Sequence, residues 1–384
     1  MILLIIILLL FLFYAVLILF YNSGWKALQV FDKTNSGKKS IRFSVIVAAR
    51  NEEKNIGFLL HSLTLQSYPK DFFEVIVVDD HSTDGTAAIV NNFVPNSNIK
   101  LVQLKEDGIN AYKKKAIAKG IATAKNDWVI CTDADCVVNE NWLDTFNSFI
   151  NEEKPVFVAA PVALVTALQE PVDRQSPSIL YTFQTLDFLT LQGITAASVY
   201  KNIHSMCNGA NLAYKKDTFY EVDGFKGIDD IASGDDMLLM HKIWKRYPQK
   251  VKYLKSKQSI VATLAAASWK DFFHQRIRWA SKAKYYDDKR ILAVLVLVYL
   301  FNFSFLILLA LAWININYLY AFLILWVSKT IIELPFITSI SRFFNRMQLV
   351  KYFFLFQPLH IAYTIVSGFL GSFGRYVWKG RTVK

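Results

Sequence analysis

Pairs of aspartates stand directly after two short apolar runs, and their types and spacing suit the binding of a divalent cation. The pairs are Asp79 with Asp80 and Asp133 with Asp135. Asp133 and Asp135 precede no immediate helix, and they would repel each other without a cation. Carboxylate oxygens are hard ligands that suit Mg²⁺ or Mn²⁺, and these ions commonly bridge protein carboxylates to a diphosphate. We therefore expect Asp135, with Asp133, to hold such an ion.

Helix capping is the simpler explanation for each polar segment taken singly. Asp80, Ser82 or Asp84 could cap a helix that begins at Thr83, and Asn51 could cap the first expected helix, at Ile56–Leu63. Capping is a poor account of all the segments together, because carboxylates follow more than one expected strand.

Two further groups carry charges that would suit a sugar diphosphate. Asp235 and Asp236 stand at the start of a helical pattern, where one could act as a carboxylate base or both could only complement the helix dipole. The lysines of Lys113–Lys115, with Lys119, could offset phosphate charge. A solvated face is the simpler alternative for any one of these lysines.

A third group lies on one face of an expected helix that Ser268 would cap. Gln275, Arg278 and Trp279 are three and four residues apart, so their side chains share that face. An amide, a cation and an indole together could bind a phosphate and a sugar ring. Core packing with snorkelling at a membrane surface is the alternative.

The elements that must position these residues alternate along the chain, which predicts a mostly parallel sheet flanked by helices. The expected strands are Phe43–Ala48, Glu74–Val78, Ile99–Gln103 and Trp128–Thr132, and the expected helices are Ile56–Leu63, Thr83–Val90 and Asn110–Ala124. Ligands of such sheets bind at the carboxyl ends of the strands. Ala49, Arg50 and Glu52, which follow the first strand, should therefore share one edge with the aspartates.

The composition is that of a membrane protein with a soluble part, since 53% of the residues are hydrophobic and 19% are charged. Residues 1–20 contain no charge, Gly or Pro and are long enough to span a hydrocarbon core. Apolar blocks at 291–313 and 318–337 predict a membrane hairpin. A last block, at 352–373, could span the membrane or lie at its surface.

Charges within and beside the apolar blocks also carry information. Lys329 and Glu333 interrupt a block, and we expect them to face protein or water. Basic residues follow the first apolar block, which places the next domain in the cytoplasm. The net charge of +12 comes from such flanks, so it indicates membrane lipids and not nucleic acid. The 3 cysteines cannot form a disulfide framework, which fits a reducing compartment such as the cytoplasmic side of a bacterial inner membrane.

Four motifs in this order resemble the membrane-bound family 2 glycosyltransferases, which include cellulose, chitin and hyaluronan synthases. The motifs are VVDDHSTDGT, TDADC, SGDD and QRIRW, the last matching the family's Q-x-x-R-W. The resemblance covers about Phe43 to Tyr286 and implies a GT-A fold and a UDP-sugar donor. Asp235 stands where a Glu is commoner in the family.

The resemblance also implies a role for each motif residue. Asp79 and Asp80 would contact the nucleoside, and Asp236 would be the catalytic base, with Asp235 beside it. The expected donor-binding residues are Ala49, Arg50, Glu52, Asp79, Asp80, Lys115, Asp133, Gln275 and Arg278. The expected acceptor-binding residues are Asn208, Gly209 and Trp279, and the expected metal ligands are Asp133 and Asp135.

Together, pattern and resemblance divide the chain into five regions. These are an N-terminal transmembrane helix at 1–22, a basic linker at 23–42, a GT-A glycosyltransferase domain at 43–260, an interfacial amphipathic helix region at 261–290 and a membrane region of two to three helices at 291–384.

We expect an inverting, metal-dependent glycosyltransferase that moves a sugar to a hydroxyl of a lipid-linked or glycan acceptor at the inner membrane face. A polyprenyl phosphate is an alternative acceptor, although it is already ionised and needs no base. Processive polysaccharide synthesis is another alternative, although three or four spanning helices are few for an export channel. A non-catalytic nucleotide-sugar sensor would be expected to lack Asp135 or Asp236, and the chain has both.

Overall fold

The structure is a computed structural model that describes residues 1–33, 39–95, 97–105, 112–169, 178–203, 206–231, 234–282, 288–373, 376–378 and 381–383. Lys38, Asn110, Ser233 and Tyr286, which belong to segments interpreted above, lie outside these ranges. The chain divides into two compact units. The helical unit is Met1–Leu28, Pro177–His204 and Ala265–Tyr376, and the sheet unit is Gln29–Ser176, Ser205–Leu264 and Val377–Lys384.

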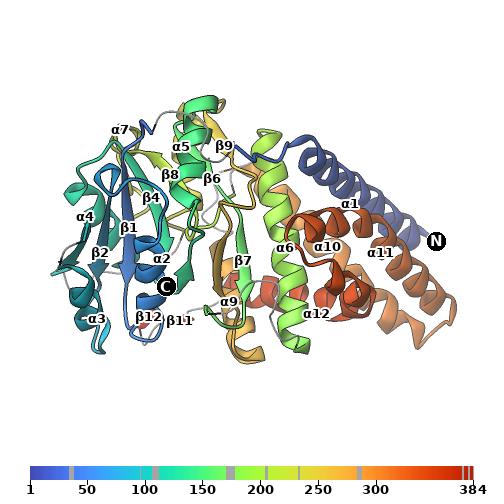
Figure 1. Cartoon of the computed structure of the whole chain (residues 1–384). Coiled ribbons are helices and arrows are strands. Elements are labelled where there is room, and N and C mark those ends of the chain that lie inside the picture. The colour runs from blue at the N-terminus through green and yellow to red at the C-terminus, as the bar shows by residue number, and fades with distance from the viewer. Residues whose placement is uncertain are drawn as a thin grey trace. The chain divides into compact units, whose positions relative to one another are not determined.

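The described part of the sheet unit is built on a seven-stranded sheet with the order β3-β2-β1-β4-β8-β6-β9 (Figure 1). Its strands are β1 (Phe43–Ala49), β2 (Phe73–Asp79), β3 (Ile99–Gln103), β4 (Trp128–Asp133), β6 (Phe157–Ala159), β8 (Leu212–Lys215) and β9 (Val251–Tyr253). The pairs β1/β2, β1/β4, β2/β3 and β6/β9 are parallel, whereas β8 is antiparallel to β4 and β6. The predicted mostly parallel sheet is confirmed, and its strands β1 and β2 are mainly apolar and almost wholly buried, as is typical of strands covered on both faces.

The sheet unit also contains a three-stranded sheet and a set of helices, and β11 (Tyr376–Trp378) pairs with β12 (Arg381–Val383) in a two-stranded sheet. The strands of the three-stranded sheet are β5 (Cys136–Val137), β7 (Val162–Val165) and β10 (Val261–Leu264), and the helices are α2 (Ile56–Thr64), η1 (Lys70–Phe72), α3 (Thr86–Phe93), α4 (Tyr112–Thr123), α5 (Trp142–Glu153), α7 (Lys216–Glu221) and α8 (Met237–Arg246). Strand β10 pairs with β7, so regular strand structure continues past residue 260, where the sequence indicated a helical region.

Helix α4 packs closely against the centre of the large sheet. A Cβ atom at Gly120 would lie 2.6 Å from Cγ2 of Ile46 on β1 and 3.2 Å from Cγ2 of Val78 on β2. Only a residue without a side chain fits such a contact, so Gly120 marks the face of α4 that meets the sheet.

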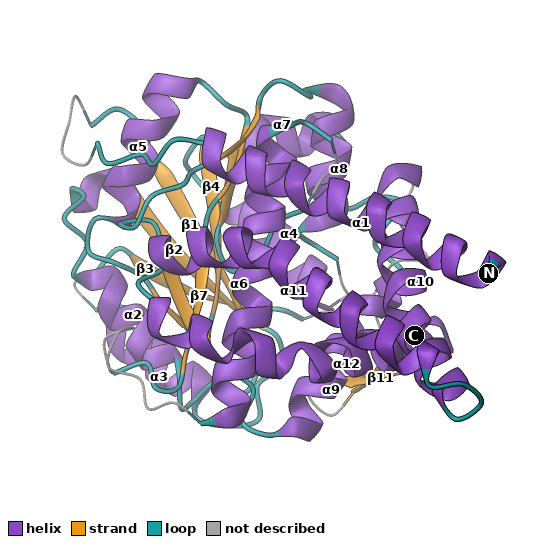
Figure 2. Ribbon diagram, turned by 90° about the vertical axis from the view of Figure 1, so that its right-hand side faces the viewer, coloured by secondary structure: helices purple, strands orange, loops and turns teal. Residues whose placement is uncertain are grey.

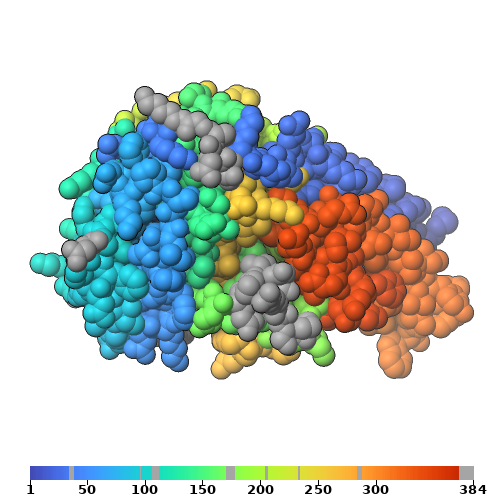
Figure 3. All heavy atoms as spheres, viewed as in Figure 1, coloured from blue at the N-terminus to red at the C-terminus, as the bar shows by residue number. Residues whose placement is uncertain are grey.

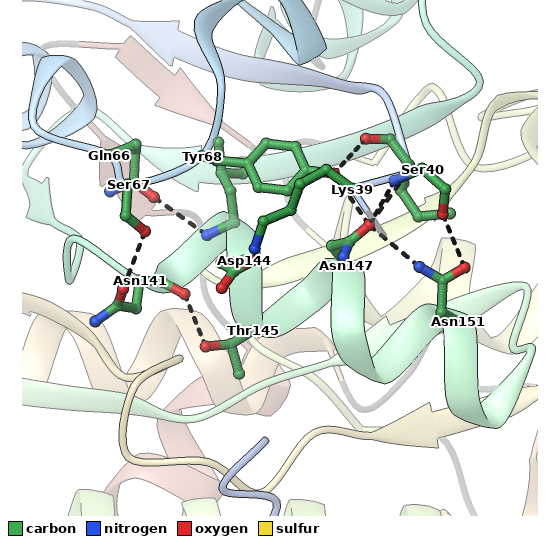
Figure 4. A network of polar contacts seen from close by, with 12 residues as sticks. Lys39, Ser40, Gln66, Ser67, Tyr68, Asn141, Asp144, Thr145, Asn147 and Asn151 are labelled. Atoms are coloured by element: carbon green, nitrogen blue, oxygen red, sulfur yellow. Dashed lines mark hydrogen bonds and ion pairs between the residues drawn. The ribbon is translucent and has the colours of Figure 1, made fainter. Parts of the chain in front are cut away.

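The segment just before β1 is fastened to α5 by a polar network (Figure 4). The side-chain oxygen of Asn147 accepts hydrogen bonds from the backbone amides of Ser40 and Ile41, each at 3.2 Å. The hydroxyl of Tyr68 donates to the same oxygen at 3.0 Å and to the Ile41 carbonyl at 2.7 Å. These bonds fix where the chain enters the first strand.

The helical unit contains the long apolar helices. They are α1 (Ile2–Ala27), α10 (Lys289–Ala312), α11 (Asn317–Phe343) and α12 (Phe353–Phe373), and they are joined by α6 (Ile179–Tyr200), α9 (Trp269–Ala280) and η4 (Met347–Tyr352). Within the described residues, four segments are long and apolar enough to cross a membrane, namely Ile2–Ala27, Lys289–Ala312, Asn317–Phe343 and Met347–Gly371. One candidate is N-terminal and three are C-terminal, as the sequence predicts.

Helices of this unit lie side by side around α6. Helix α1 contacts α6, α10 and α11, and α12 contacts α9 and α10 (Figure 2). A Cβ atom at Gly193 of α6 would lie 2.1 Å from Cδ1 of Ile340 on α11, so glycine permits their close approach. Exposed apolar side chains cover the outer faces of α1 and α10, whose atoms are dark blue and orange in Figure 3. Lipid tails would cover such faces.

Lys329 and Glu333 face protein, as predicted. The Lys329 side chain is fully buried, and its Nζ donates to Oε1 of Glu333 at 2.7 Å and to Oε1 of Gln357 at 2.6 Å. The hydroxyl of Tyr14 also donates to Glu333. Charged side chains within a membrane-spanning helix are stabilised in this way by partners on neighbouring helices.

Candidate active site

The strand register brings the polar residues after β1, β2 and β4 to one edge of the large sheet. Ala49 pairs with Asp79 across β1 and β2, and Ala48 pairs with Asp133 across β1 and β4. Because these strands are parallel, their carboxyl ends meet at the same edge. The sequence predicts this convergence from the order of elements alone.

Hydrogen bonds tie the loop after β1 to the loop after β2. The backbone amide of Asn51 donates to Oγ of Ser82 at 3.0 Å, and the amide of Thr83 donates to Oδ1 of Asn51 at 2.8 Å. Asn51 and His81 adopt left-handed backbone conformations, with φ of 51° and 55°. The expectation that Asn51 caps the next helix is wrong, because α2 has Asn55 at its N-cap and Asn51 bonds across to the second loop instead.

Helix α3 begins at Thr86 and not at Thr83, because the residues before it take part in this cross-linking. Asp84 accepts hydrogen bonds from the amide of Thr86 at 3.0 Å and from the amide of Glu53 at 3.2 Å. Burial raises the pKa of Asp84, but the hydrogen bonds from Thr86 and Glu53 outweigh it, so the net pKa is lowered. The N-cap residue of α3 is Gly85, so Asp84 is not the cap that the sequence allowed and bonds to Thr86 from one residue before it.

The residues expected to contact the nucleoside lie together at this edge. Asp80 is buried, its amide donates to the carbonyl of Ala49 at 2.8 Å, and Nη1 of Arg50 donates to the Asp80 carbonyl at 2.8 Å. Oδ1 of Asp79 accepts from the amide of Ser82 at 3.3 Å. Asp79 and Asp80 are thus held at fixed positions by the loops that carry them.

Glu52 forms hydrogen bonds to residues at the starts of α2 and α3. Its Oε2 accepts a hydrogen bond from Nδ2 of Asn55 at 2.8 Å, and its backbone amide donates to Oγ1 of Thr86 at 2.7 Å. The Glu52 side chain is buried, and the two hydrogen bonds connect the start of α2 to the start of α3.

A second cluster gathers carboxylates from two separate segments around one lysine. Nζ of Lys113, on α4, lies 2.7 Å from Oδ1 of Asp133 and 3.4 Å from Oδ2 of Asp235. Asp236 accepts from its neighbour Met237 through Oδ1 at 2.7 Å and from the amide of Gly209 through Oδ2 at 3.0 Å. The structure therefore brings Asp133, Asp235 and Asp236 together.

Gly209 lies at the centre of this cluster. A Cβ atom placed on it would be 3.5 Å from the carboxylates of Asp235 and Asp236 and 3.5 Å from Nζ of Lys113. Asn208, the residue before it, accepts a hydrogen bond from the amide of Ala210 at 3.0 Å and so shapes the turn.

The charge of Lys113 is stabilised by its surroundings. Burial alone would lower the pKa of Lys113, but the carboxylates of Asp133, Asp235 and Asp236 hold it well above the usual value. The lysine is therefore an ammonium at neutral pH. One positive charge beside three carboxylates leaves the cluster negative, as a cation-binding region requires.

Within Lys113–Lys115, we expect from the sequence that Lys115 binds the donor, whereas the structure places Lys113 beside the carboxylates. Lys115 and Lys119 are exposed. Lys114 is buried and donates to the carbonyls of Ile228 at 2.7 Å and Ile231 at 2.6 Å, so it fixes the loop ahead of Gly234. The helix register could have indicated Lys113, because Lys113 lies two turns before Gly120 and so on the same, sheet-facing side of α4.

Asp133 and Asp135 are the two carboxylates that the sequence suggests as ligands of a divalent cation. Asp135 is half-buried, and its Oδ1 lies 3.9 Å from Sγ of Cys136. Burial, followed by the charges of Asp135 and Asp133, raises the pKa of the Cys136 thiol well above its usual value. Among the described residues no group of three or more His, Cys, Asp and Glu could hold a metal. Two hard carboxylates fit Mg²⁺ or Mn²⁺ if phosphate and water complete the shell.

Gln275, Arg278 and Trp279 belong to α9 of the helical unit. Ser268 caps this helix as predicted, with its Oγ accepting from the amide of Asp271 at 3.1 Å. The three motif side chains are partly exposed on their helix. The ring of Trp279 lies near Phe188 of α6, with 6.3 Å between ring centroids.

Comparisons with known proteins agree with these observations. Residues 44–219 match the model of the family described as Glycosyl transferase family 2. The poly(ribitol-phosphate) beta-N-acetylglucosaminyltransferase TarS of Staphylococcus aureus is 39% identical over 112 residues, which cover 29% of this chain and 19% of TarS. The poly-beta-1,6-N-acetyl-D-glucosamine synthase of Staphylococcus epidermidis is 27% identical over 238 residues, covering 62% of this chain and 53% of the synthase. The chain thus spans about half the length of that synthase and a smaller share of TarS.

Among solved structures, a mannosyltransferase from Pyrobaculum calidifontis in complex with GDP-Man and Mn²⁺ is similar to the whole chain. Its TM-score is 0.61 at 19% sequence identity, and the match covers 96% of this chain and 99% of that one. At this identity the likeness shows the fold, and it confirms the predicted GT-A architecture with membrane helices.

Proposed function

The chain belongs to glycosyl transferase family 2 through residues 44–219, and on that premise we propose that it transfers a sugar from a nucleotide-sugar donor to an acceptor hydroxyl at a membrane surface. The observation that carries this proposal is the gathering of Asp133, Asp235 and Asp236 around Lys113. These groups would face the donor diphosphate and the acceptor hydroxyl together.

Asp236 is the proposed catalytic base, with Asp235 beside it. Backbone amides of Met237 and Gly209 each bond one oxygen of Asp236 and so fix the plane of the carboxylate. Each oxygen retains a lone pair that can accept the proton of an acceptor hydroxyl. The hydroxyl oxygen then forms a bond to the anomeric carbon while the bond from that carbon to the diphosphate breaks, and the nucleoside diphosphate leaves with the electron pair. A single displacement of this kind inverts the anomeric centre.

Lys113 would neutralise charge on the departing diphosphate from its fixed place beside Asp133. A raised pKa keeps it protonated, so it offers a permanent positive charge within a partly buried site. Asp135 with Asp133 would hold Mg²⁺ or Mn²⁺, which when bound supplies Lewis-acid stabilisation of the same leaving group. The Mn²⁺ in the mannosyltransferase complex supports this part of the proposal.

The donor is proposed to be a UDP-sugar. Asp79, Asp80, Ala49 and Arg50 would hold its nucleoside at the ends of β1 and β2. N-acetylglucosamine is the first sugar to test, because it occurs in the names of both sequence relatives.

The acceptor is proposed to be lipid-linked or a glycan, presented where four candidate spans meet the cytoplasmic surface. Gln275 and Arg278 would contact the diphosphate, and Trp279 would contact an acceptor sugar. Processive synthesis of a polysaccharide is the second candidate, and the likeness to the poly-beta-1,6-N-acetyl-D-glucosamine synthase over 62% of this chain favours it.

A single assay tests the proposal. The full chain, reconstituted in lipid nanodiscs with Mn²⁺ and UDP-N-acetylglucosamine, should release UDP, and added lipid extract or oligosaccharide should increase the rate. Mass spectrometry of the lipids and glycans then distinguishes one added sugar from a polymer. Absence of nucleoside diphosphate release, as UDP or GDP, with every common UDP-sugar and GDP-sugar would contradict the proposal.

A further inference from the structure

A buried ion pair holds the helix that carries the Q-x-x-R-W motif. Arg276 follows Gln275 directly, yet only 5% of its surface is exposed, whereas the motif side chains beside it are partly exposed. Nη2 of Arg276 lies 2.6 Å from Oδ2 of Asp187 on α6, which is 6% exposed. A charge pair buried to this degree fixes the position of both side chains, because either charge alone would be costly there.

Arg276 also contacts two of the motif residues directly. Its guanidinium carbon lies 4.3 Å from the centroid of the Trp279 ring, which is a close cation–π contact. Nη1 of Arg276 donates to Oε1 of Gln275 at 3.4 Å. The other neighbour of the guanidinium is Phe272, whose ring centroid is 4.7 Å away. Trp279 therefore rests against a cation that cannot move freely.

The ion pair is extended to α12. The hydroxyl of Tyr363 donates to Oδ1 of Asp187, and Nε2 of His360 lies 3.9 Å from the same oxygen. The rings of Tyr363 and Phe272 also pack edge to face, with 5.5 Å between centroids. Asp187 thus links α6, α9 and α12, all within the helical unit.

We propose that Arg276, clamped by Asp187 and Tyr363, is a positioning residue that sets the orientation of Trp279 and Gln275. This inference rests on the proposed function for the part that Gln275 plays towards the diphosphate and Trp279 towards the acceptor. It adds a mechanism for their placement: helix α6 and the candidate membrane helix α12 hold the acceptor-side indole through one arginine. A change in the packing of α12 would then reach the acceptor side through this clamp.

The first test observes Trp279 without relying on activity. The full chain is labelled with 5-fluorotryptophan in nanodiscs, and the fluorine resonance of Trp279 is assigned by its loss in Trp279→Phe. Arg276→Gln and Asp187→Asn should shift or broaden that resonance, and Arg276→Lys, which keeps a cation, should restore part of the wild-type position. Lys270→Gln removes a charge from an exposed side chain of the same helix and should leave the resonance unchanged.

A second variant guards against simple misfolding. Tyr363→Phe removes only the hydroxyl that donates to Asp187 and should move the Trp279 resonance in the same direction by a smaller amount. A Trp279 resonance that stays in place in Arg276→Gln and in Tyr363→Phe would overturn the proposal.

Steady-state kinetics distinguish a positioning role of Arg276 from a purely structural one. Arg276→Gln should raise the acceptor KM about tenfold or more while the affinity for UDP falls by a smaller factor, and Arg276→Lys should recover part of both losses. Equal losses of acceptor use and UDP affinity would overturn the positioning role. If the wild-type chain transfers no sugar, the proposed function fails, whereas the fluorine spectra still decide the placement of Trp279.

Discussion

Nζ of Lys113 lies 2.7 Å from Oδ1 of Asp133, so helix α4 delivers a cation to the carboxylate that ends strand β4. The same nitrogen lies 3.4 Å from Asp235, which comes from a distant part of the chain. One ammonium thereby holds together acidic groups that would otherwise repel each other. This relationship links the sheet edge to the segment that carries the proposed base.

Replacing the lysine tests its place in the donor site. Lys113→Met should weaken UDP binding by roughly ten- to a hundredfold, because hydrogen bonds to charged groups contribute about 1.5–3 kcal/mol. Isothermal titration calorimetry of the full chain in detergent measures this. Lys70→Met, at an exposed lysine, serves as the control. A larger loss of affinity in Lys115→Met than in Lys113→Met would contradict the assignment.

The aspartate pair makes a prediction about metal dependence. Asp135→Ala should lower metal-stimulated transfer by roughly a hundredfold or more, since the ion would lose a protein ligand and the leaving group its stabilisation. UDP release measured over a series of Mn²⁺ concentrations checks this. Asp71→Ala removes an exposed carboxylate and should keep the wild-type response. Full activity of Asp135→Ala in the presence of a chelator would disprove the metal role.

The indole of α9 makes a prediction about the acceptor. Trp279→Ala should lower acceptor-dependent turnover by roughly three- to tenfold or more, because aromatic contacts contribute about 0.5–1.5 kcal/mol. UDP affinity should change little. Trp313→Ala, at an indole that is 92% exposed, is the matched control. Equal losses of acceptor use and nucleotide affinity would refute the stacking assignment.

Glu74 makes a prediction about stability and pH. It accepts hydrogen bonds from Nζ of Lys100 at 2.6 Å, from the amide of Lys125 at 2.7 Å and from Oγ of Ser44 at 2.8 Å. Burial raises the pKa of Glu74, but these partners outweigh it and lower the net pKa below the ordinary 4.5. A carboxyl with a lowered folded pKa stabilises the protein above pH 4.5, and this stability is lost as the pH falls through the folded pKa.

Glu74→Gln should therefore lower the free energy of unfolding by about 1–3 kcal/mol at pH 7. Thermal unfolding of the full chain, followed from pH 7 to pH 3, should show the wild type and variant converging at the acidic end. Glu140→Gln, at an exposed glutamate, should not change the midpoint. A difference between wild type and Glu74→Gln that persists undiminished at pH 3 would contradict this pH dependence.

The sheet and its reactive edge were predictable from sequence because their signals are local. The runs that become β1 and β2 are mainly apolar, and Asp79 and Asp80 stand at the end of the second run. The parallel order then requires that Asp79 and Asp133 meet at one edge. Register across the sheet, such as Ala48 opposite Asp133, only refines that expectation.

Other parts of the site depend on geometry that a linear pattern does not carry. Asn51 bonds across to Thr83 because two loops adopt left-handed turns that bring them together. The choice between Lys113 and Lys115 depends on which face of α4 meets the sheet, and only Gly120 marks that face. The pairing of Arg276 with Asp187 joins two helices far apart in sequence, and no local rule predicts it.

The central claim is that Asp236 is the base of a glycosyl transfer, and Asp236→Asn tests it most directly. This change removes the basic oxygen while keeping almost the whole volume of the side chain. UDP binding and UDP release should be measured on the same reconstituted full-length preparation. The account predicts UDP affinity within about threefold of the wild type and turnover lowered by roughly a hundredfold or more. Wild-type turnover in Asp236→Asn would contradict it.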